Sequence, residues 1–335
     1  MNYIGSKHSL IGEIETILKE NGVAAEGVAL DLFSGTGAVA KAFKKMGFVT
    51  YANDWQFYSF VTTHSFIGLN AVPDNGMEAL RLLDRLPGKE GEFFHEFCEG
   101  GQAGRQYFSK ENGLRIQSIR DQIDAWVIAE SDKHWLVACL IESADRVANT
   151  ASVYGAYLKH IKKSAQKPMR LVPIEPIPSK HQHRAFCLDA KQMLQQFNQT
   201  KIKLTYIDPP YNHRQYSGNY HILETIARWD LDRFKPRGVT GLRHSKELQS
   251  PYCRRSKAFG AFQELLARVN SEYVLFSYNN EGLLSEQELV SLLPGASFKK
   301  IPYQRFRADN DGENRNYKKN STEEFLILVR QTVSK

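Results

Sequence analysis

Two consecutive prolines, Pro209 and Pro210, follow a short apolar run at residues 204–207 and restrict how the chain folds there. Neither proline has a backbone N–H, and each favours an extended conformation in the residue before it, so a helix or strand ladder stops at this point. The apolar run is therefore predicted to be a buried strand that ends just before Asp208. Because open α/β sheets bind ligands at the carboxyl ends of their strands, Asp208 and Tyr211 mark a candidate site.

The groups in this turn suit a flat base that carries an amino group. Asp208 and a carbonyl of Pro209 or Pro210 can accept the two amino hydrogens, while Tyr211 offers a ring face for stacking. A turn that only terminates a strand is the alternative interpretation of the tetrapeptide by itself.

A second pattern is that of strand, glycine loop and helix. The predicted strand at residues 27–33 contains Asp31 and Phe33, and the following loop contains Gly35 and Gly37. Glycines allow backbone amides to approach a cofactor closely, because no Cβ atom obstructs the approach. The loop lacks both the full dinucleotide glycine pattern and the lysine of a P-loop. These absences argue against a dinucleotide or ATP and favour a nucleoside cofactor without phosphate.

Acidic residues follow two further predicted strands. The strand at residues 48–53 leads into Asp54 and Trp55, which suit a ribose diol and an attached adenine; a capping aspartate beside a core tryptophan is the alternative. The third strand begins near residue 185 and leads to Asp189, which lies either near the cofactor or at the N-cap of the next helix.

Between the second and third strands the apolar pattern becomes mainly helical, which indicates an insertion. A closing antiparallel strand pair at about residues 298–306 and 324–329 is typical of the edge of a mixed sheet. We therefore predict an α/β fold. Its predicted parts are a catalytic domain at 1–56 and 185–335, a basic insertion at about 233–258, and a mainly helical target-recognition lobe at 57–184.

The charge balance favours a polyanionic partner without proving one. Lys and Arg total 44 against 37 Asp and Glu, which gives a net charge of +7. Basic residues are interleaved with tyrosines, a mixture suited to phosphates and bases, although a solvated face is the alternative for any single lysine. The candidate nucleic-acid-binding residues are Tyr154, Lys159, Lys162, Lys163, Arg214, Tyr216, Arg237, Arg243, Arg254 and Arg255.

The remaining sequence features concern compartment and metals. The four cysteines are far apart without paired metal-ligand spacing, so we expect reduced thiols and no metal site. The N-terminal segment lacks the apolar core of a signal peptide, and no run approaches the length of a membrane span. We expect a cytoplasmic protein that does not bind membranes.

The order of the motifs resembles that of the Dam-like, alpha-group N6-adenine DNA methyltransferases, and more closely the FokI-type modification methylases among them. The cofactor loop precedes the Asp-Pro-Pro-Tyr tetrapeptide, as the alpha arrangement requires. The segments that carry the resemblance are residues 2–7, 31–37, 53–54 and 208–211, and the closer likeness covers 107–126, 148–159 and 214–221. The resemblance implies a Rossmann-like class I methyltransferase sheet with S-adenosylmethionine (AdoMet) as cofactor.

The resemblance also implies roles for individual residues. Asp208, Pro209, Pro210 and Tyr211 would be catalytic. The AdoMet contacts would be Tyr3 and Lys7 at the N-terminal segment, Gly35 and Gly37 beside the methionine part, Asp54 on the ribose, and Asp31, Phe33, Trp55, Asp189 and Asp208.

The implied partner is double-stranded DNA, and the implied origin is a bacterium or phage. The same resemblance implies a monomer and leaves open whether a cognate restriction endonuclease, acting separately, exists. N4-cytosine methylation of DNA, adenine methylation of RNA and a catalytically silent DNA-binding subunit with the same fold are the alternatives.

Overall fold

The computed structural model describes residues 7–197, 199, 202–213, 215–243, 249–304 and 321–331. Contacts divide these residues into two compact units, described separately below. The helical unit contains the described residues of 56–178 and 216–243, and the sheet unit contains those of 7–55, 179–215 and 249–331. The predicted division placed residues 216–243 with the sheet, whereas their contacts group them with the helices.

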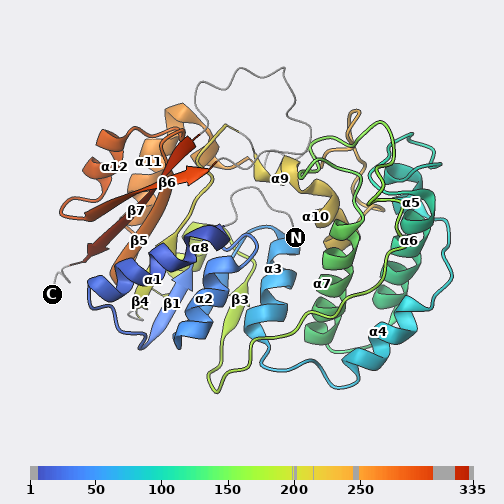
Figure 1. Ribbon diagram of the computed structural model, residues 1–335, viewed down its shortest axis with the longest axis horizontal. Helices are drawn as coiled ribbons and strands as arrows, with labels where there is room; N and C mark the ends of the chain where they lie inside the picture. Colours follow the sequence, from blue (N-terminus) through green and yellow to red (C-terminus); the bar gives the residue numbers. More distant parts are fainter. Residues whose placement is uncertain are drawn as a thin grey trace. The chain divides into compact units, whose positions relative to one another are not determined.

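Within its described residues, the sheet unit has a seven-stranded mixed sheet of order β3-β2-β1-β4-β5-β7-β6 (Figure 1). Neighbours from β3 to β5 are parallel, and β7 is antiparallel to both β5 and β6. The strands are β1 Val28–Asp31, β2 Val49–Asn53, β3 Arg184–Phe186, β4 Ile202–Ile207, β5 Ser271–Asn279, β6 Ser297–Gln304 and β7 Ser321–Arg330. The predicted α/β class and antiparallel edge are confirmed.

Helices cover both faces of this sheet, and their apolar stripes explain why. Helices α1 and α2 share one core with Leu204 and Tyr206 of β4, and α8, α11 and α12 share a second core with Ile202 and Ile207. Because β4 is buried on both faces, its sequence is mainly apolar, with Lys203 and Thr205 as the exceptions. The helical segments are η1 Lys7–Leu10, α1 Ile11–Glu20, α2 Ala38–Met46, α8 Ala190–Gln195, η4 Pro251–Cys253, α11 Arg255–Leu266 and α12 Glu286–Leu292.

The strand order reverses direction at β1, since β2 lies on one side of it and β4 on the other. Such a switch point leaves a crevice beyond the carboxyl ends of the two central strands, where open α/β sheets bind ligands. Asp31 is the last residue of β1, Asp208 directly follows β4 and Asp54 directly follows β2. The topology therefore brings three predicted site residues to one edge of the sheet.

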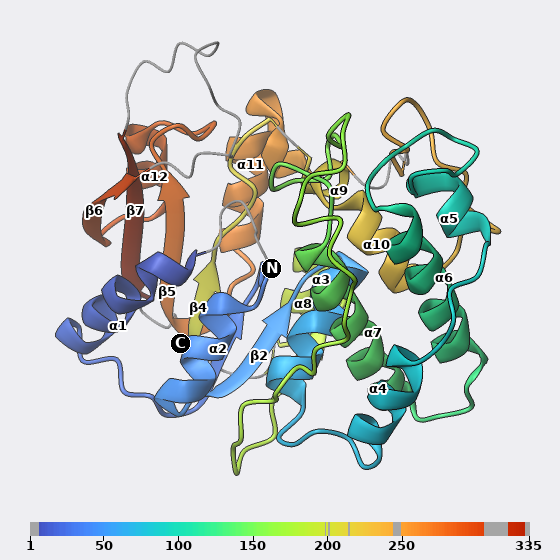
Figure 2. The same ribbon diagram turned by 45° about the vertical axis from the view of Figure 1, so that its right-hand side comes forward.

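The helical unit is built around α6 and α7, which run side by side in both views (Figures 1 and 2). The helices predicted at 109–126 and 133–147 are observed with boundaries shifted by a few residues. The helical segments are α3 Phe57–Thr63, η2 His64–Gly68, α4 Gly76–Asp84, α5 Glu92–Phe97, α6 Lys110–Ala125, α7 Glu130–Arg146, α9 Tyr216–Asn219 and α10 His221–Arg228. No helix in the described ranges is both long and apolar enough to cross a membrane.

Residues 147–183 contain no regular helix or strand and form the irregular part of the lobe predicted at 57–184. Two buried asparagines hold much of the segment in place. The Asn149 amide donates to the carbonyls of Gln106 and Leu158, and the Asn112 amide donates to those of Ala165 and Lys167. Side-chain amides thus take over the role that a backbone ladder has elsewhere.

Candidate active site

The glycine loop follows β1 and precedes α2, the strand, loop and helix order that the sequence predicts. Gly35 and Gly37 have φ angles of 50° and 70°, a left-handed region that favours glycine. The Asp54 carboxylate accepts a 2.9 Å hydrogen bond from the Gly35 N–H, and the Asn53 carbonyl accepts one of 2.8 Å from Ser34. The loop after β1 and the end of β2 therefore form one hydrogen-bonded edge.

The Asn53 side chain extends this edge to the connection between β3 and α8. Its amide group donates to the carbonyls of Leu32 and Leu188, at 3.2 and 3.0 Å, and its oxygen accepts from the Leu188 N–H at 3.1 Å. Asn53 is buried, so these contacts are shielded from water. Asn53, which precedes Asp54 in the predicted motif, therefore links the carboxyl ends of β1, β2 and β3. Its side chain is engaged in these contacts.

Three carboxylates gather near the switch point. Asp31 is buried, and burial together with the charges of Asp208 and Asp54 raises its pKa well above the usual range. One Asp31 oxygen accepts from the Ala40 N–H at 3.1 Å, while the other, and the buried Ser34 hydroxyl, have no hydrogen-bond partner among the described residues. Buried polar atoms without partners are costly, so this corner is suited to a ligand that donates hydrogen bonds.

Asp208 has a similar environment at the end of β4. Burial raises its pKa to about 7, with a further contribution from Glu324 and an opposing one from Lys7. The Lys7 Nζ lies 3.2 Å from Asp208 Oδ1. This is ion-pair distance without the direction of a hydrogen bond, and no described residue donates a directed hydrogen bond to that oxygen. Asp208 thus retains capacity to accept a proton donor.

The backbone of Tyr211 and the ring of Tyr278 help to position the Tyr211 side chain. Its carbonyl accepts a 2.8 Å hydrogen bond from Leu283, and its ring packs edge-to-face on Tyr278 at 5.8 Å between centroids. The Lys7 Nζ lies 5.3 Å from the Tyr211 ring centroid. The N-terminal lysine and the Asp-Pro-Pro-Tyr turn therefore meet in one place, as the predicted site requires.

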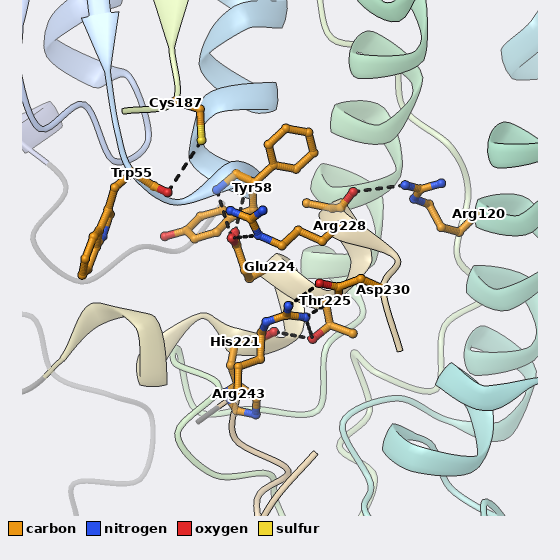
Figure 3. A network of polar contacts seen from close by, with 12 residues as sticks. Trp55, Tyr58, Arg120, Cys187, His221, Glu224, Thr225, Arg228, Asp230 and Arg243 are labelled. Carbon is orange, nitrogen blue, oxygen red and sulfur yellow. Dashed lines mark hydrogen bonds and ion pairs between the residues drawn. The ribbon is translucent and has the colours of Figure 1, made fainter. Parts of the chain in front are cut away.

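The other predicted cofactor residues have varied surroundings. Phe33 packs edge-to-face on Tyr252, and Trp55 is half-buried with its carbonyl accepting from the Cys187 thiol at 3.6 Å (Figure 3). Asp189 is exposed and caps α8, where its side chain accepts from the Lys191 N–H at 2.9 Å in a capping box. Asp189 was predicted to lie either near the cofactor or at a helix N-cap, and its hydrogen bond agrees with the N-cap. Tyr3 lies outside the described residues.

The predicted nucleic-acid-binding residues separate into exposed and committed side chains. Tyr154 is completely buried and donates to Asp145 at 2.8 Å, so its ring and hydroxyl belong to the core. Arg243 forms two hydrogen bonds to the Asp230 carboxylate, of 2.7 and 2.6 Å, and only 10% of its side chain is exposed (Figure 3). Lys162 donates to the Thr150 carbonyl. These three side chains are occupied by structural contacts.

Five of the other members of the set are exposed to solvent. Tyr216 is half-buried at the start of α9, and Arg214 lies outside the described residues. In the sheet unit, Arg254 contacts Gln249, and Arg255 contacts both carboxylate oxygens of Glu288 at 3.0 Å. The exposed side chains are Lys159, Lys163, Arg237, Arg254 and Arg255.

Sequence reasoning missed a buried carboxylate beside the site, Glu324 of β7. Its Oε2 lies 3.2 Å from the Lys7 Nζ, and its Oε1 accepts from the Asn279 amide at 2.8 Å. A sequence signal for this residue exists. Glu324 is separated by two and four residues from Leu326 and Leu328, so it shares with them the buried face of the strand. A charged residue in phase with a buried face requires a partner.

The arrangement fits AdoMet, judged by charge and by open hydrogen-bonding capacity. AdoMet carries a positive sulfonium and an ammonium group, and the crevice edge presents the carboxylates of Asp31, Asp54 and Asp208. The unpartnered Asp31 oxygen offers an acceptor where the glycine loop leaves the backbone accessible. A dinucleotide would instead require groups for its phosphates, which this loop lacks.

The strand order and the antiparallel β7 are consistent with a class I methyltransferase fold. Residues 3–292 match the D12 class N6 adenine-specific DNA methyltransferases, and the chain belongs to this family. The chain is thus an adenine-specific DNA methyltransferase, a family that uses AdoMet as its methyl donor, and the predicted family is confirmed.

Named relatives support the same assignment. The chain is 40% identical over 341 residues to the type II methyltransferase M.NlaIII of Neisseria lactamica, covering 99% of this chain and 100% of that one. It is 34% identical to the modification methylase StsI of Streptococcus sanguinis and to the type II methyltransferase M.FokI of Planomicrobium okeanokoites, over 94% and 93% of this chain. It spans 50% of the length of each of these two.

Proposed function

We propose that this chain methylates N6 of an adenine that is flipped out of double-stranded DNA, at a specific short sequence. The observation that carries the proposal is the Asp208 carboxylate, only 15% exposed and with open acceptor capacity, whose partner Lys7 lies 5.3 Å from the centroid of the Tyr211 ring. Flipping is needed because the adenine amino group is buried in base pairing. The sequence resemblance to type II and modification methylases supports a role as the modification enzyme of a type II restriction-modification system.

In the proposed reaction, Asp208 and a carbonyl of Pro209 or Pro210 accept the two amino hydrogens of the target. These bonds draw the hydrogens out of the ring plane, so the nitrogen lone pair is less delocalised and points at its electrophile. Tyr211 stacks on the base and fixes its plane. When bound, AdoMet supplies a methyl group activated by the positive charge on its sulfur. Alignment by the protein then provides most of the acceleration.

The proposed AdoMet contacts follow the crevice edge. Asp31 and the loop of Gly35 and Gly37 would hold the methionine part, and Asp54 the ribose. Phe33 and Trp55 are proposed to pack beside the adenine. Tyr3 is retained as an expected contact of the N-terminal segment, and Asp189 is proposed to act only as a helix cap, because its side chain accepts from the Lys191 N–H.

The proposed DNA contacts are the exposed basic residues and the half-buried Tyr216. Lys159, Lys163 and Arg237 belong to the helical unit, which we propose as the target-recognition lobe. Exposed lysines and arginines supply affinity for phosphates and a dependence on salt concentration. We further propose that the enzyme acts as a monomer and that a separate restriction endonuclease recognises the same site.

The experiment that tests the function is methyl transfer from labelled AdoMet to unmodified bacterial DNA, followed by single-molecule sequencing of the product. Methyladenine confined to one short motif is the expected result. Methylcytosine at that motif would identify the base as wrong, and incorporation only into RNA would identify the polymer as wrong. AdoMet binding without any incorporation would indicate a catalytically silent subunit.

A further inference from the structure

One buried ammonium group is shared by two carboxylates at the proposed catalytic turn. The Lys7 Nζ lies 3.2 Å from Asp208 Oδ1 and 3.2 Å from Glu324 Oε2. The Lys7 and Glu324 side chains are each 5% exposed, so water screens these contacts only weakly. The three groups carry a net charge of −1 when all are ionised. A single lysine therefore cannot neutralise both carboxylates.

Glu324 is held in place from its other side. Asn279 of β5 is paired in register with Glu324 of β7, and its amide donates to Glu324 Oε1 at 2.8 Å. The Asn279 oxygen in turn accepts from the Glu281 N–H at 2.8 Å, which fixes the orientation of the amide. The two strands thus direct one oxygen of Glu324 at Lys7.

The same ammonium also contacts the ring on which the target base is proposed to stack. With the Lys7 Nζ 5.3 Å from the centroid of the Tyr211 ring, the lysine links Glu324 to both Asp208 and Tyr211. A displacement of Lys7 would therefore change the surroundings of an acceptor and of a stacking surface together. Geometry of this kind is sensitive, because catalytic alignment loses much of its effect when groups shift by about 1 Å.

We propose that Glu324 is a positioning residue for methyl transfer, acting through Lys7. By binding Lys7, Glu324 holds the ammonium at the turn, where it contacts both Asp208 and the ring of Tyr211. The fixed ammonium favours the ionised form of Asp208, which accepts a hydrogen from the adenine amino group, while the charge of Glu324 partly opposes this effect. This inference rests on the proposed role of Asp208 and assigns Glu324 no contact with substrate.

The charges around Asp208 define the sign of the expected effects. Lys7 lowers the pKa of Asp208, Glu324 raises it, and burial makes the largest contribution, giving a value of about 7. The Asp31 carboxylate and the buried Tyr206 hydroxyl also interact with Asp208. Below its pKa, Asp208 is neutral and its protonated oxygen no longer accepts, so activity should fall as the pH drops through this value. Removing the charge of Glu324 should shift this limb to lower pH, and removing that of Lys7 should shift it to higher pH.

The test compares pH–rate profiles of the full chain with Glu324→Gln, Glu324→Asp and Lys7→Met. We expect Glu324→Gln to lower the midpoint of the acid limb by about one pH unit and Lys7→Met to raise it by a similar amount. Glu324→Asp keeps the charge and should restore most of the wild-type midpoint. Glu323→Gln is the matched control, because Glu323 is the neighbouring residue of β7, is exposed, and loses the same charge.

A second measurement determines the pKa of Asp208 directly, without the methyl-transfer assay. Titration of the Asp208 carboxyl carbon by NMR in the protein without cofactor, assigned with Asp208→Asn, should show the same opposite shifts. Equal midpoints in wild type and Glu324→Gln, or equal shifts in Glu324→Asp and Glu324→Gln, would overturn the inference. If Glu324→Gln does not fold, an unraised midpoint in Lys7→Met overturns it. A wild-type chain that transfers no methyl group overturns the proposed function instead.

Discussion

Two carboxylates, the buried Glu224 of the helical unit and the largely buried Asp208 of the sheet unit, have opposite relations to their surroundings. Glu224 of α10 accepts from the backbone N–H groups of Phe57 and Tyr58, at 3.1 and 2.9 Å, and from Arg228 at 2.5 Å (Figure 3). It caps the first turn of α3, whose own N-cap residue Gln56 makes no side-chain capping bond. Glu224 is thus satisfied by the protein itself.

Asp208 is not satisfied in this way. Its Oδ1 forms an ion pair with Lys7 and accepts no directed hydrogen bond from the described residues. A satisfied buried carboxylate stabilises the fold, whereas an unsatisfied one destabilises it and is retained for chemistry. The difference teaches that burial alone does not identify a functional acid. The number of directed hydrogen-bond donors around a buried carboxylate identifies a functional acid, and mutation of Asp208 and Glu224 tests this criterion.

The largest expected effect is on Asp208. Asp208→Ala should reduce methyl transfer by at least about 100-fold, because a preorganised acceptor for the amino hydrogens is lost. DNA binding should survive, and the free energy of unfolding should fall little or rise, since an incompletely paired buried charge is removed. Methyl transfer is measured with labelled AdoMet, DNA binding by titration, and the free energy of unfolding by urea denaturation. Turnover comparable to wild type would remove Asp208 from the mechanism.

Glu224→Ala should show the reverse pattern. It leaves two backbone N–H groups at the start of α3 without their acceptor, so unfolding should become easier by roughly 2–4 kcal/mol. Urea unfolding of this variant beside Glu78→Ala, an exposed glutamate on α4, measures the difference. A loss equal to that of Glu78→Ala would show that the capping contact contributes nothing, and the comparison with Asp208 would fail.

Tyr211→Ala tests the stacking surface next to Asp208. The loss of a base–aromatic contact should weaken transition-state binding by about 1–3 kcal/mol. Tyr211→Phe is the matched control, because it keeps the ring and should retain most of the activity. Steady-state kinetics on a single-site duplex measure both. An unchanged kcat/KM in Tyr211→Ala would mean that the target base stacks elsewhere.

The smallest expected effect is on Asp189, a carboxylate near the catalytic edge that resembles Glu224 in its bonding. Asp189→Ala should cost about 1 kcal/mol of stability, as for other N-cap residues. Its AdoMet affinity, measured by calorimetry, should stay within a few-fold of wild type, and Asp189→Asn should restore the cap. An affinity loss above about 10-fold, worth 1.4 kcal/mol, would place Asp189 in the cofactor site after all.

Local sequence determined the parts of this protein whose partners are close along the chain. The apolar run before Pro209 predicted β4 and its end, because proline removes the donor that a strand needs. Gly35 and Gly37 predicted the loop after β1, because their left-handed φ angles favour glycine. The order of these motifs was sufficient for the family, which residues 3–292 confirm.

Only the tertiary structure decided which polar groups are available. Lys7 and Glu324 are 317 residues apart, and Glu224 and Phe57 are 167 apart, so no local pattern indicates that they meet. Tyr154 and Arg243 fitted a basic, aromatic composition, yet packing directs both at internal acids. Composition reports which groups a chain carries, whereas burial and hydrogen-bond geometry determine which of them remain free to bind, because each contact depends on two distant segments.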